Sequence, residues 1–374
     1  MRAIKARRYT PNDAPLIVAQ SGRMLAELAA RAGRPAVIID QYGDQDTRQW
    51  ARAVVTVADF DLESLTAAVV DLSAHWTIKQ VIYGSGLENH LESLIWLAQR
   101  FSVTGCSPEV IRALHDKPKF FNQLQNLGID FPEVRFTPPC HAKGWLLKPY
   151  RGCGGEGVVW ADALHAADPA RDQYYWQRWQ AGRALSLLAF ADTTRTHVIG
   201  FHRLYHRALQ HEAFRFTGLD NRVQLPRDVR MQWRDRAHHV AETFQLRGLF
   251  GIDFLWDGQN TWLLEINPRP PASLCAYEPR QASQWLAAHW GETPRPWLDS
   301  ARRRWRHYQI CYTYRAYRVP QSAKWPAWVN DQPSPGHDIP PCAPLCSFTA
   351  TGRTPNHLKR NVQRRKAFIY NLMN

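Results

Sequence analysis

The sequence has no apolar run close to the ~20 residues that a membrane-spanning helix needs, and only seven of its 374 residues are cysteines. The basic start of the chain has an apolar run too short for the core of a signal peptide. An odd number of scattered cysteines argues against a disulfide framework. Cys342 and Cys346 lack the second pair of ligands that a zinc site needs. We therefore expect a cytoplasmic protein, without a membrane partner, whose cysteines are reduced.

Acidic residues are scarce relative to basic ones. Lys and Arg number 47 against 33 Asp and Glu, which gives a net charge of +14. This charge attracts anions, and both nucleic acid and an acidic small molecule fit it. Basic clusters occur at Arg302 to Arg304 and from Lys359 to Lys366, and a solvated helical face explains each better than specific binding does. Nucleic acid is thus the less favoured partner, although the sequence does not exclude it.

A glycine-rich stretch, "LLKPYRGCGGEGVVW" from Leu146 to Trp160, lacks the features of the common phosphate-binding loops. Its spacing is G-x-G-x-x-G, but it runs into a strand-like segment, whereas a dinucleotide-binding loop opens a helix. The H-R-D and D-F-G motifs of kinases are absent, as is the Gly-Lys-Ser/Thr end of a Walker A loop. We expect a flexible flap between two strands, after Lys148, whose amides can approach phosphates. A plain surface hairpin fits these residues equally well.

The first hundred residues alternate between strand and helix patterns. Apolar runs "LIVA", "AVIID", "AVVTVA" and "QVIYG" are separated by helical stretches, which predicts a small α/β unit with a parallel sheet. Ligands of such sheets bind outside the carboxyl ends of the strands. The loops Gln20 to Arg23, Asp40 to Thr47 and Gly84 to Glu88 therefore face a candidate ligand crevice, although each is equally well interpreted as a plain connection.

Two later segments, "LFGIDFLW" and "TWLLEIN", flank a turn centred on Asp257 and Gly258, which predicts a β-hairpin. With a loop of odd length, such as Gly258 to Asn260, Asp253 lies directly across from Glu265, whereas a two-residue loop shifts the pairing by one. Strand alternation assigns two sets of side chains to the core face: Phe250, Ile252, Phe254 and Trp256 on one strand, and Trp262, Leu264 and Ile266 on the other.

The opposite face of this hairpin carries Asp253, Glu265 and Asn267. Like charges directly across two strands destabilise the pair unless a counter-ion is present. Mg²⁺ prefers a few carboxylate and amide oxygens and fills its other positions with water and phosphate. We therefore predict a metal site here in preference to a solvated polar face. Arg269 keeps the same alternation and either meets a phosphate or carboxylate through its planar fork or points to solvent.

In this order the blocks resemble the ATP-grasp superfamily over most of Leu16 to about Pro271. The segments that carry the resemblance are "HDKPKFFNQLQNLGI", "LLKPYRGCGGEGV", "WQRWQAGRALSLLAF", "GLFGIDF" and "LLEINPRP". The resemblance implies an α/β and α+β protein with the ATP-grasp fold, a Rossmann-like preface and a small β-containing region at the C-terminus. The domains expected are residues 11–107 for the preface, 108–184 and 185–293 for the two ATP-grasp subdomains, and 294–374 for the C-terminal region.

The resemblance also implies roles for residues that match its motifs. Lys117 and Lys148 would contact the phosphates of ATP, and Lys148 and Arg269 would be the catalytic residues. The glycines of the flap would cover the phosphates, namely Gly152, Gly154, Gly155 and Gly157. The adenine pocket would be lined by the backbone of Gln177, Arg178, Trp179 and Gln180. Asp253, Glu265 and Asn267 would hold Mg²⁺, or Mn²⁺ in its place. Many members have an acidic residue for the ribose where this chain reads Gly182 to Ser186 without one, which puts the ribose contact in doubt.

A narrower resemblance rests on "SGRMLAELAARAG", "IIDQYGDQDT", "VIYGSGLE" and "GWLLKPYRGCGGEG". These look like ATP-grasp proteins found with methylofuran and tetrahydromethanopterin enzymes, which are similar to the tyramine–glutamate ligase. The resemblance implies a carboxylate–amine ligase that forms an acyl phosphate and takes an acidic small molecule and an amine acceptor. A positive surface would steer such a substrate inward. Self-association into a homo-oligomer is left open, and a non-catalytic protein that binds nucleic acid or a partner is the rival interpretation.

The group that deprotonates the amine is not identified by any motif. Three histidines lie between the motifs, His202, His206 and His211. Their position makes them candidates, but ordinary core or surface histidines are the simpler interpretation.

Overall fold

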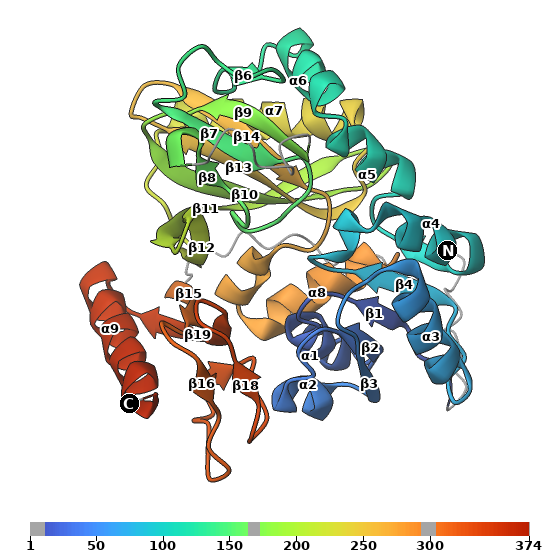
Figure 1. The fold of residues 1–374 in the computed structure, drawn as a ribbon. Helices are drawn as coiled ribbons and strands as arrows, with labels where there is room; N and C mark the ends of the chain where they lie inside the picture. The colour runs from blue at the N-terminus through green and yellow to red at the C-terminus, as the bar shows by residue number, and fades with distance from the viewer. Residues whose placement is uncertain (1–11, 164–172, 293–303, 374) are drawn as a thin grey trace.

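The computed structural model describes residues 12–163, 173–292 and 304–373 (Figure 1). The first unit is a five-stranded parallel sheet in the order β3-β2-β1-β4-β5. Its strands are β1 (Leu16–Val18), β2 (Val37–Asp40), β3 (Ala53–Thr56), β4 (Gln80–Tyr83) and β5 (Ser102–Thr104). The helices that accompany it are α1 (Arg23–Arg31), α2 (Gln45–Trp50), α3 (Leu62–Ser73), η1 (Leu87–Asn89) and α4 (Leu91–Arg100). This confirms the parallel α/β unit that the alternating pattern predicts.

Two short helices lead from this sheet to a smaller antiparallel sheet. They are α5 (Pro108–His115) and α6 (Lys117–Asn126). The second sheet has the order β6-β9-β7-β8, with β6 (Val134–Arg135), β7 (Trp145–Pro149), β8 (Val159–Trp160) and β9 (Tyr174–Arg178), and η2 (Ala161–Ala163) follows β8. Because Leu146 pairs with Trp160 in an antiparallel register, the glycine-rich stretch does join two strands of one hairpin.

The third sheet has eight strands in the order β14-β13-β10-β11-β12-β15-β19-β17. They are β10 (Arg183–Ala191), β11 (Thr196–Leu209), β12 (Glu212–Asp220), β13 (Gly248–Trp256), β14 (Thr261–Asn267), β15 (Trp305–Tyr312), β17 (Val329–Asn330) and β19 (Pro344–Gly352). The helices and smaller strands around it are α7 (Arg227–Thr243), η4 (Ala272–Ala276), α8 (Pro279–His289), β16 (Tyr317–Arg318), β18 (Asp338–Ile339) and α9 (Pro355–Leu372). The C-terminal strands thus extend the sheet that carries the hairpin; the residue bounds of the expected domains stay a prediction.

The basic segment from Lys359 to Lys366 lies in α9, as the sequence predicts, and the helix attaches through Leu358 and Ile369 to the cluster around β19. In the other basic cluster, Arg302 and Arg303 lie outside the described residues. All seven cysteines are described and are free thiols. Among the described residues, no helix is long and apolar enough to cross a membrane.

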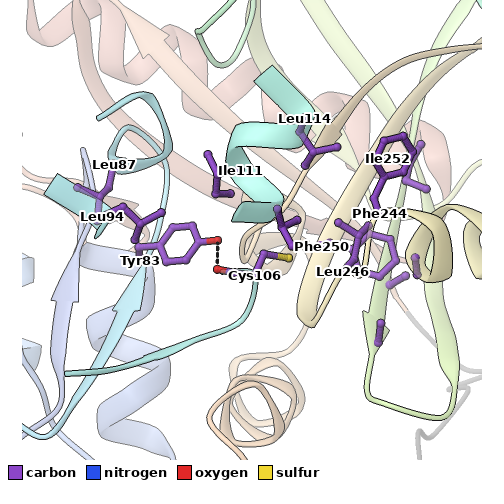
Figure 2. Packing of buried hydrophobic residues seen from close by; sticks show 14 of the residues in the cluster. Tyr83, Leu87, Leu94, Cys106, Ile111, Leu114, Phe244, Leu246, Phe250 and Ile252 are labelled. Atoms are coloured by element: carbon purple, nitrogen blue, oxygen red, sulfur yellow. Dashed lines mark hydrogen bonds between the residues drawn. The ribbon is translucent and has the colours of Figure 1, made fainter. Parts of the chain in front are cut away.

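One hydrophobic core runs from the parallel sheet into the eight-stranded sheet. Figure 2 shows Tyr83 and Leu94 on one side of this core, and Phe250 and Ile252 on the other. The Tyr83 hydroxyl donates to the carbonyl oxygens of Cys106, at 2.9 Å, and Pro268, at 3.0 Å. Pro268 directly follows β14, so the end of the predicted metal hairpin is attached to the parallel sheet.

The predicted hairpin is formed by β13 and β14, and Asp253 pairs with Glu265 as expected. The route to this pairing differs from the prediction. Trp256 pairs with Thr261, so four residues form the loop, and a bulge at Leu264 then shifts the register by one. The assignment of Trp262 and Leu264 to the core face is therefore wrong. Leu263 is the fully buried residue, opposite Phe254, because the bulge reverses the alternation before it.

Candidate active site

The two hairpin carboxylates and Asn267 form one hydrogen-bonded group. The Asn267 side-chain nitrogen donates to Asp253 Oδ2 and to Glu265 Oε1, both at 3.3 Å. Ser186, which lies opposite Asp253 on β10, also donates a hydrogen bond to that carboxylate. The structure thus brings together all three predicted metal ligands, on adjacent strands of one sheet.

The carboxylates of Asp253 and Glu265 repel each other, and this repulsion shifts the pKa of Asp253. Burial raises the pKa of Asp253 well above its usual value, and the charge of Glu265 acts in the same direction. Burial also acts to raise the pKa of Glu265, but the charge of Lys148 outweighs it and the pKa falls below its usual value. Without a further cation, one proton on Asp253 is the natural way to relieve this repulsion. A divalent cation would do the same and leave both groups ionised.

The predicted phosphate-binding lysines lie beside these carboxylates. Lys148 Nζ donates to Gln177 Oε1 at 3.2 Å. Burial acts to lower the pKa of Lys148, but the Tyr175 hydroxyl and then Glu265 outweigh it and raise the pKa. Burial lowers the pKa of Lys117 to about 8, with Glu265 opposing and Lys148 adding to the effect. Two ammonium groups therefore face the same carboxylate, as expected for groups that neutralise a phosphate chain.

The segment predicted for the adenine pocket sends its side chains in different directions. Gln177 is buried and binds Lys148, whereas Arg178 lies over the Trp145 ring at 5.5 Å and Trp179 is 46% exposed. The amides of Arg178 and Trp179 already donate to Glu133 and Gly144. A base would therefore have to use carbonyl oxygens of this segment or the amide of Gln180, and the adenine contact stays a prediction.

The flap lies against β12, the fifth strand of the large sheet. The Phe216 amide donates to the Gly154 carbonyl at 2.8 Å, and the Gly157 amide donates to Glu212 Oε1 at 2.9 Å. Gly155 has a φ of +76°, and a Cβ there would overlap the Phe214 carbonyl oxygen. Glycine at 155 is thus required by a close approach of two backbones, which is a stronger reason than conformational freedom alone.

Arg269 lies inside the site, not in solvent. Its Nε pairs with Glu88 Oε1 at 2.5 Å, and its NH2 donates to Asn267 Oδ1 at 3.2 Å. Both side chains of the ion pair are only 8% exposed. The carboxylate of Glu88 raises the pKa of Arg269 against the effect of burial, so the guanidinium stays charged. The interpretation of Arg269 as a solvent-facing exit residue is therefore wrong.

Replacing Glu88 by Gln should lower the free energy of unfolding by roughly 3 kcal/mol, because it leaves the Arg269 charge buried without its counter-ion. Urea unfolding of the full chain measures this change. The control is Glu133→Gln, which removes an exposed partner of Arg135 and should change the midpoint little. Equal midpoints for the Glu88 variant and the unaltered chain would contradict the importance of this ion pair.

Sequence reasoning missed Tyr175 and Ser186 as members of the site, and it placed Glu88 only within a loop that faces a candidate ligand crevice. Tyr175 could have been found, because it lies two residues before Gln177 on one strand and so shares its face. Ser186 could not, since its place depends on the pairing of β10 with β13. Among the histidines, His206 lies near Lys148 and Glu265, and burial lowers its pKa. His202 is a core residue bonded to the Tyr277 hydroxyl at 2.8 Å, as the simpler interpretation predicts.

The three loops at the carboxyl ends of the parallel strands do face a cavity, as predicted. This cavity, of about 380 Å³, is lined by Gln20, Tyr42 and Ser85 from these loops. Cys153 of the flap and Arg269 line it as well. Arg269 connects this cavity with the hairpin, because its NH2 group donates to Asn267 Oδ1.

The donor set fits Mg²⁺. Asp253 and Glu265 offer only oxygen, and the repulsion between them is the charge that a hard cation offsets. No group of three His, Cys, Asp or Glu side chains suited to a metal occurs among the described residues. A cation here would thus rest on two carboxylates, the Asn267 amide and ligands from outside the chain, such as water and phosphate.

Comparison with known proteins identifies a shared domain. Residues 114–273 match the model of the ATP-grasp domain family. Over 180 residues the chain is 23% identical to an uncharacterized protein of Methanocaldococcus jannaschii, which covers 45% of this chain and 44% of that protein. The chain spans less than half the length of the curated relatives it matches.

Solved structures match over nearly the whole chain. The N5-carboxyaminoimidazole ribonucleotide synthetase of Thermus thermophilus has a TM-score of 0.71 at 16% identity and covers 94% of this chain and 98% of its own. The biotin carboxylase of Campylobacter jejuni has a TM-score of 0.68 at 14% identity, with 94% and 90% covered. At these identities the likeness is one of fold, and it extends from the parallel sheet to the C-terminal strands.

Proposed function

We propose that this chain, which has the ATP-grasp fold with an N-terminal parallel-sheet preface, is an ATP-dependent ligase that joins a carboxylate to an amine. The observation that supports this most is the pairing of Asp253 with Glu265, close to the half-buried lysines Lys117 and Lys148. Fixed carboxylates and ammonium groups around one point suit the transfer of a phosphoryl group, which depends mainly on positioning and on charge neutralisation.

In this proposal the substrate carboxylate attacks the γ-phosphorus of ATP, ADP leaves, and an acyl phosphate forms. The neutral amine nitrogen then attacks the acyl carbon and displaces phosphate, and the proton that the nitrogen loses leaves with that phosphate; an amine that binds as an ammonium group must first give up one proton. Lys148 and Lys117 hold the phosphates, and Arg269, fixed by Glu88, faces the developing negative charge. Mg²⁺ bound to Asp253, Glu265 and Asn267 would neutralise the phosphate oxygens. The flap, which lies against β12, keeps water from the reactive acyl phosphate.

The fold does not identify which acid and which amine this chain uses. The narrower sequence resemblance makes glutamate and tyramine the first pair to test, as in the biosynthesis of a methylofuran-type cofactor. The names of the structural matches include a carboxylase and a carboxyaminoimidazole ribonucleotide synthetase. Bicarbonate therefore belongs in the panel beside the carboxylic acids.

The test is ADP release that depends on Mg²⁺, measured with hydroxylamine present and without an amine. A carboxylate that gives a hydroxamate is the activated acid, since hydroxylamine traps acyl phosphates. Adding amines singly then identifies the acceptor by loss of hydroxamate and gain of amide. If no acid in a broad panel releases ADP, and oligonucleotides bind with a steep dependence on salt, the ligase proposal fails and the net charge of +14 is explained by nucleic acid.

A further inference from the structure

Four aromatic side chains form part of the wall of the cavity that Arg269 lines, and we call them its aromatic wall. Tyr42 comes from the preface, Phe216 from β12, and Tyr308 and Tyr312 from β15. Its volume, about 380 Å³, falls within the range of small-molecule sites. Such a wall suits a ligand with an apolar or aromatic body.

Each of the guanidinium groups that the described residues contribute to the cavity wall already has a carboxylate partner. Arg23 pairs with Glu27 at 2.7 Å. Arg215 lies 3.4 Å from Glu156 and from Glu212. Arg269 pairs with Glu88, as described above. A ligand carboxylate would therefore have to compete with the protein's own carboxylates for any of these cations.

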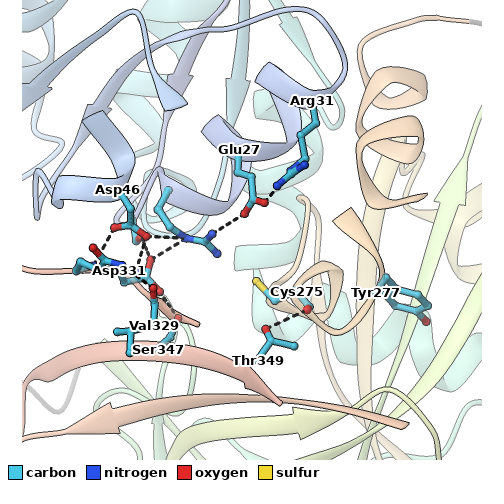
Figure 3. A network of polar contacts seen from close by, with 12 residues as sticks. Glu27, Arg31, Asp46, Cys275, Tyr277, Val329, Asp331, Ser347 and Thr349 are labelled. Atoms are coloured by element: carbon cyan, nitrogen blue, oxygen red, sulfur yellow. Dashed lines mark hydrogen bonds and ion pairs between the residues drawn. The ribbon is translucent and has the colours of Figure 1, made fainter. Parts of the chain in front are cut away.

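Asp46 and Asp331 lie near the Arg23 guanidinium, at 3.8 and 3.5 Å. Both carboxylates also accept hydrogen bonds from other groups (Figure 3). Asp331 accepts from Ser21 Oγ at 2.9 Å and from Ser347 Oγ. Asp46 accepts from the backbone amides of Asp331 and Gln332, at 3.0 and 2.9 Å. These bonds attach the loop after β17 to the preface and complete the wall of the cavity.

Asp44 differs from these neighbours. It is 5% exposed and lines the cavity, yet its side chain has no hydrogen bond or ion pair with any residue that the structure describes. It precedes α2 without capping it. Burial raises the pKa of Asp44 to about 9; the charges of Asp331 and Asp46 act in the same direction, and the charge of Arg23 opposes them without outweighing them. A buried carboxylate in this setting requires either a proton or a cation.

We propose that this cavity binds the amine substrate, with Asp44 as the partner of its ammonium group and the aromatic wall around its body. The inference rests on the proposed ligase function and names the chemical class of its acceptor. An amine fits better than an amino acid, because a free carboxylate on the ligand would find each guanidinium of the wall paired. Aromatic faces add a favourable interaction with a cation. Asp44 is thus a specificity residue within the loop Asp40 to Thr47, which the sequence marks only as a candidate ligand loop.

The decisive variant is Asp44→Asn, which keeps the shape of the side chain and removes its charge. We expect the KM for the amine to rise roughly 10- to 100-fold, as for the loss of a charged hydrogen bond, with the KM for ATP and the yield of hydroxamate without amine unchanged. Asp59→Asn is the control, because Asp59 is an exposed carboxylate of the preface outside the cavity wall. An unchanged KM for the amine in Asp44→Asn overturns the inference while the ligase function stands.

Calorimetry on the full chain tests the same inference without turnover. The probes are 2-phenylethylamine and its neutral counterpart 2-phenylethanol. The unaltered chain should bind the amine at least about tenfold more tightly, and Asp44→Asn should abolish that preference while urea unfolding confirms that it folds. Absence of amine binding, or equal preference in the variant, overturns the inference whether or not hydroxamate forms. If the unaltered chain binds glutamate tightly and Asp44→Asn does not, Asp44 binds the ammonium group of an amino acid. That result also overturns the inference.

Discussion

Replacing Glu265 by Gln should lower kcat by about 10³-fold or more and leave the fold intact. Glu265 is the ionised member of the hairpin pair, because Lys148 lowers its pKa while Asp253 has its pKa raised. It is therefore the carboxylate that a cation and a phosphate chain would depend on most, and the charge stabilisation lost is worth several kcal/mol in the transition state. Removing one of two adjacent carboxylates also relieves their repulsion, so unfolding should change little.

Steady-state ADP release across a Mg²⁺ titration measures this effect, with urea unfolding alongside it. Asp257→Asn is the matched control: it also replaces a carboxylate by an amide, in the turn of the same hairpin, where Asp257 accepts from the backbone amides of Gln259 and Asn260. This control should turn over normally. A Glu265→Gln variant with a near-normal rate at saturating Mg²⁺ would remove the metal assignment and with it the main support for the ligase.

The hairpin shows how far sequence reasoning reaches at this site. Alternation and the Asp257–Gly258 turn predict two strands that carry Asp253 and Glu265 on one face, and the structure has that arrangement. The bulge at Leu264 leaves no trace in the pattern of apolar residues, because a bulge is fixed by the pairing of both strands. The prediction has a loop of three residues and no bulge, whereas the structure has a loop of four residues and one extra residue, Leu264, on β14. These two differences cancel, so that Asp253 still pairs with Glu265.

Contacts between distant segments lay beyond the sequence. Glu88 and Arg269 are 181 residues apart, and Ser21 and Asp331 are 310 apart. The rule that ligands bind at the carboxyl ends of parallel strands placed the preface loops on a cavity. It could not say that β15 and the loop after β17 form the opposite wall. The sequence also could not show that Asp44 lacks a hydrogen-bond partner among the described residues. Only the packed structure shows which of the neighbouring carboxylates have partners.

Replacing Gly155 by Ala should raise the KM for ATP by about 100-fold. A methyl group there overlaps the Phe214 carbonyl oxygen. Neither backbone can shift without losing hydrogen bonds, because such bonds attach the flap to β12 on both sides of the contact. The flap must therefore move away from the strand, and a displacement near 1 Å at a phosphate-binding loop is enough for a loss of this size. ATP affinity by calorimetry and steady-state kinetics both measure it.

Gly154→Ala separates this overlap from backbone strain. Gly154 also has a positive φ, +62°, but the nearest atom to an added Cβ is 3.7 Å away. Only the strain of the left-handed conformation remains, about 1 to 2 kcal/mol, so the KM for ATP should rise less than in Gly155→Ala. Gly33→Ala, with φ of +78° and open space around the added methyl, tests strain far from the site and should leave ATP affinity unaltered. If the two flap variants lose the same affinity, the contact with β12 does not position the flap, and strain alone accounts for both.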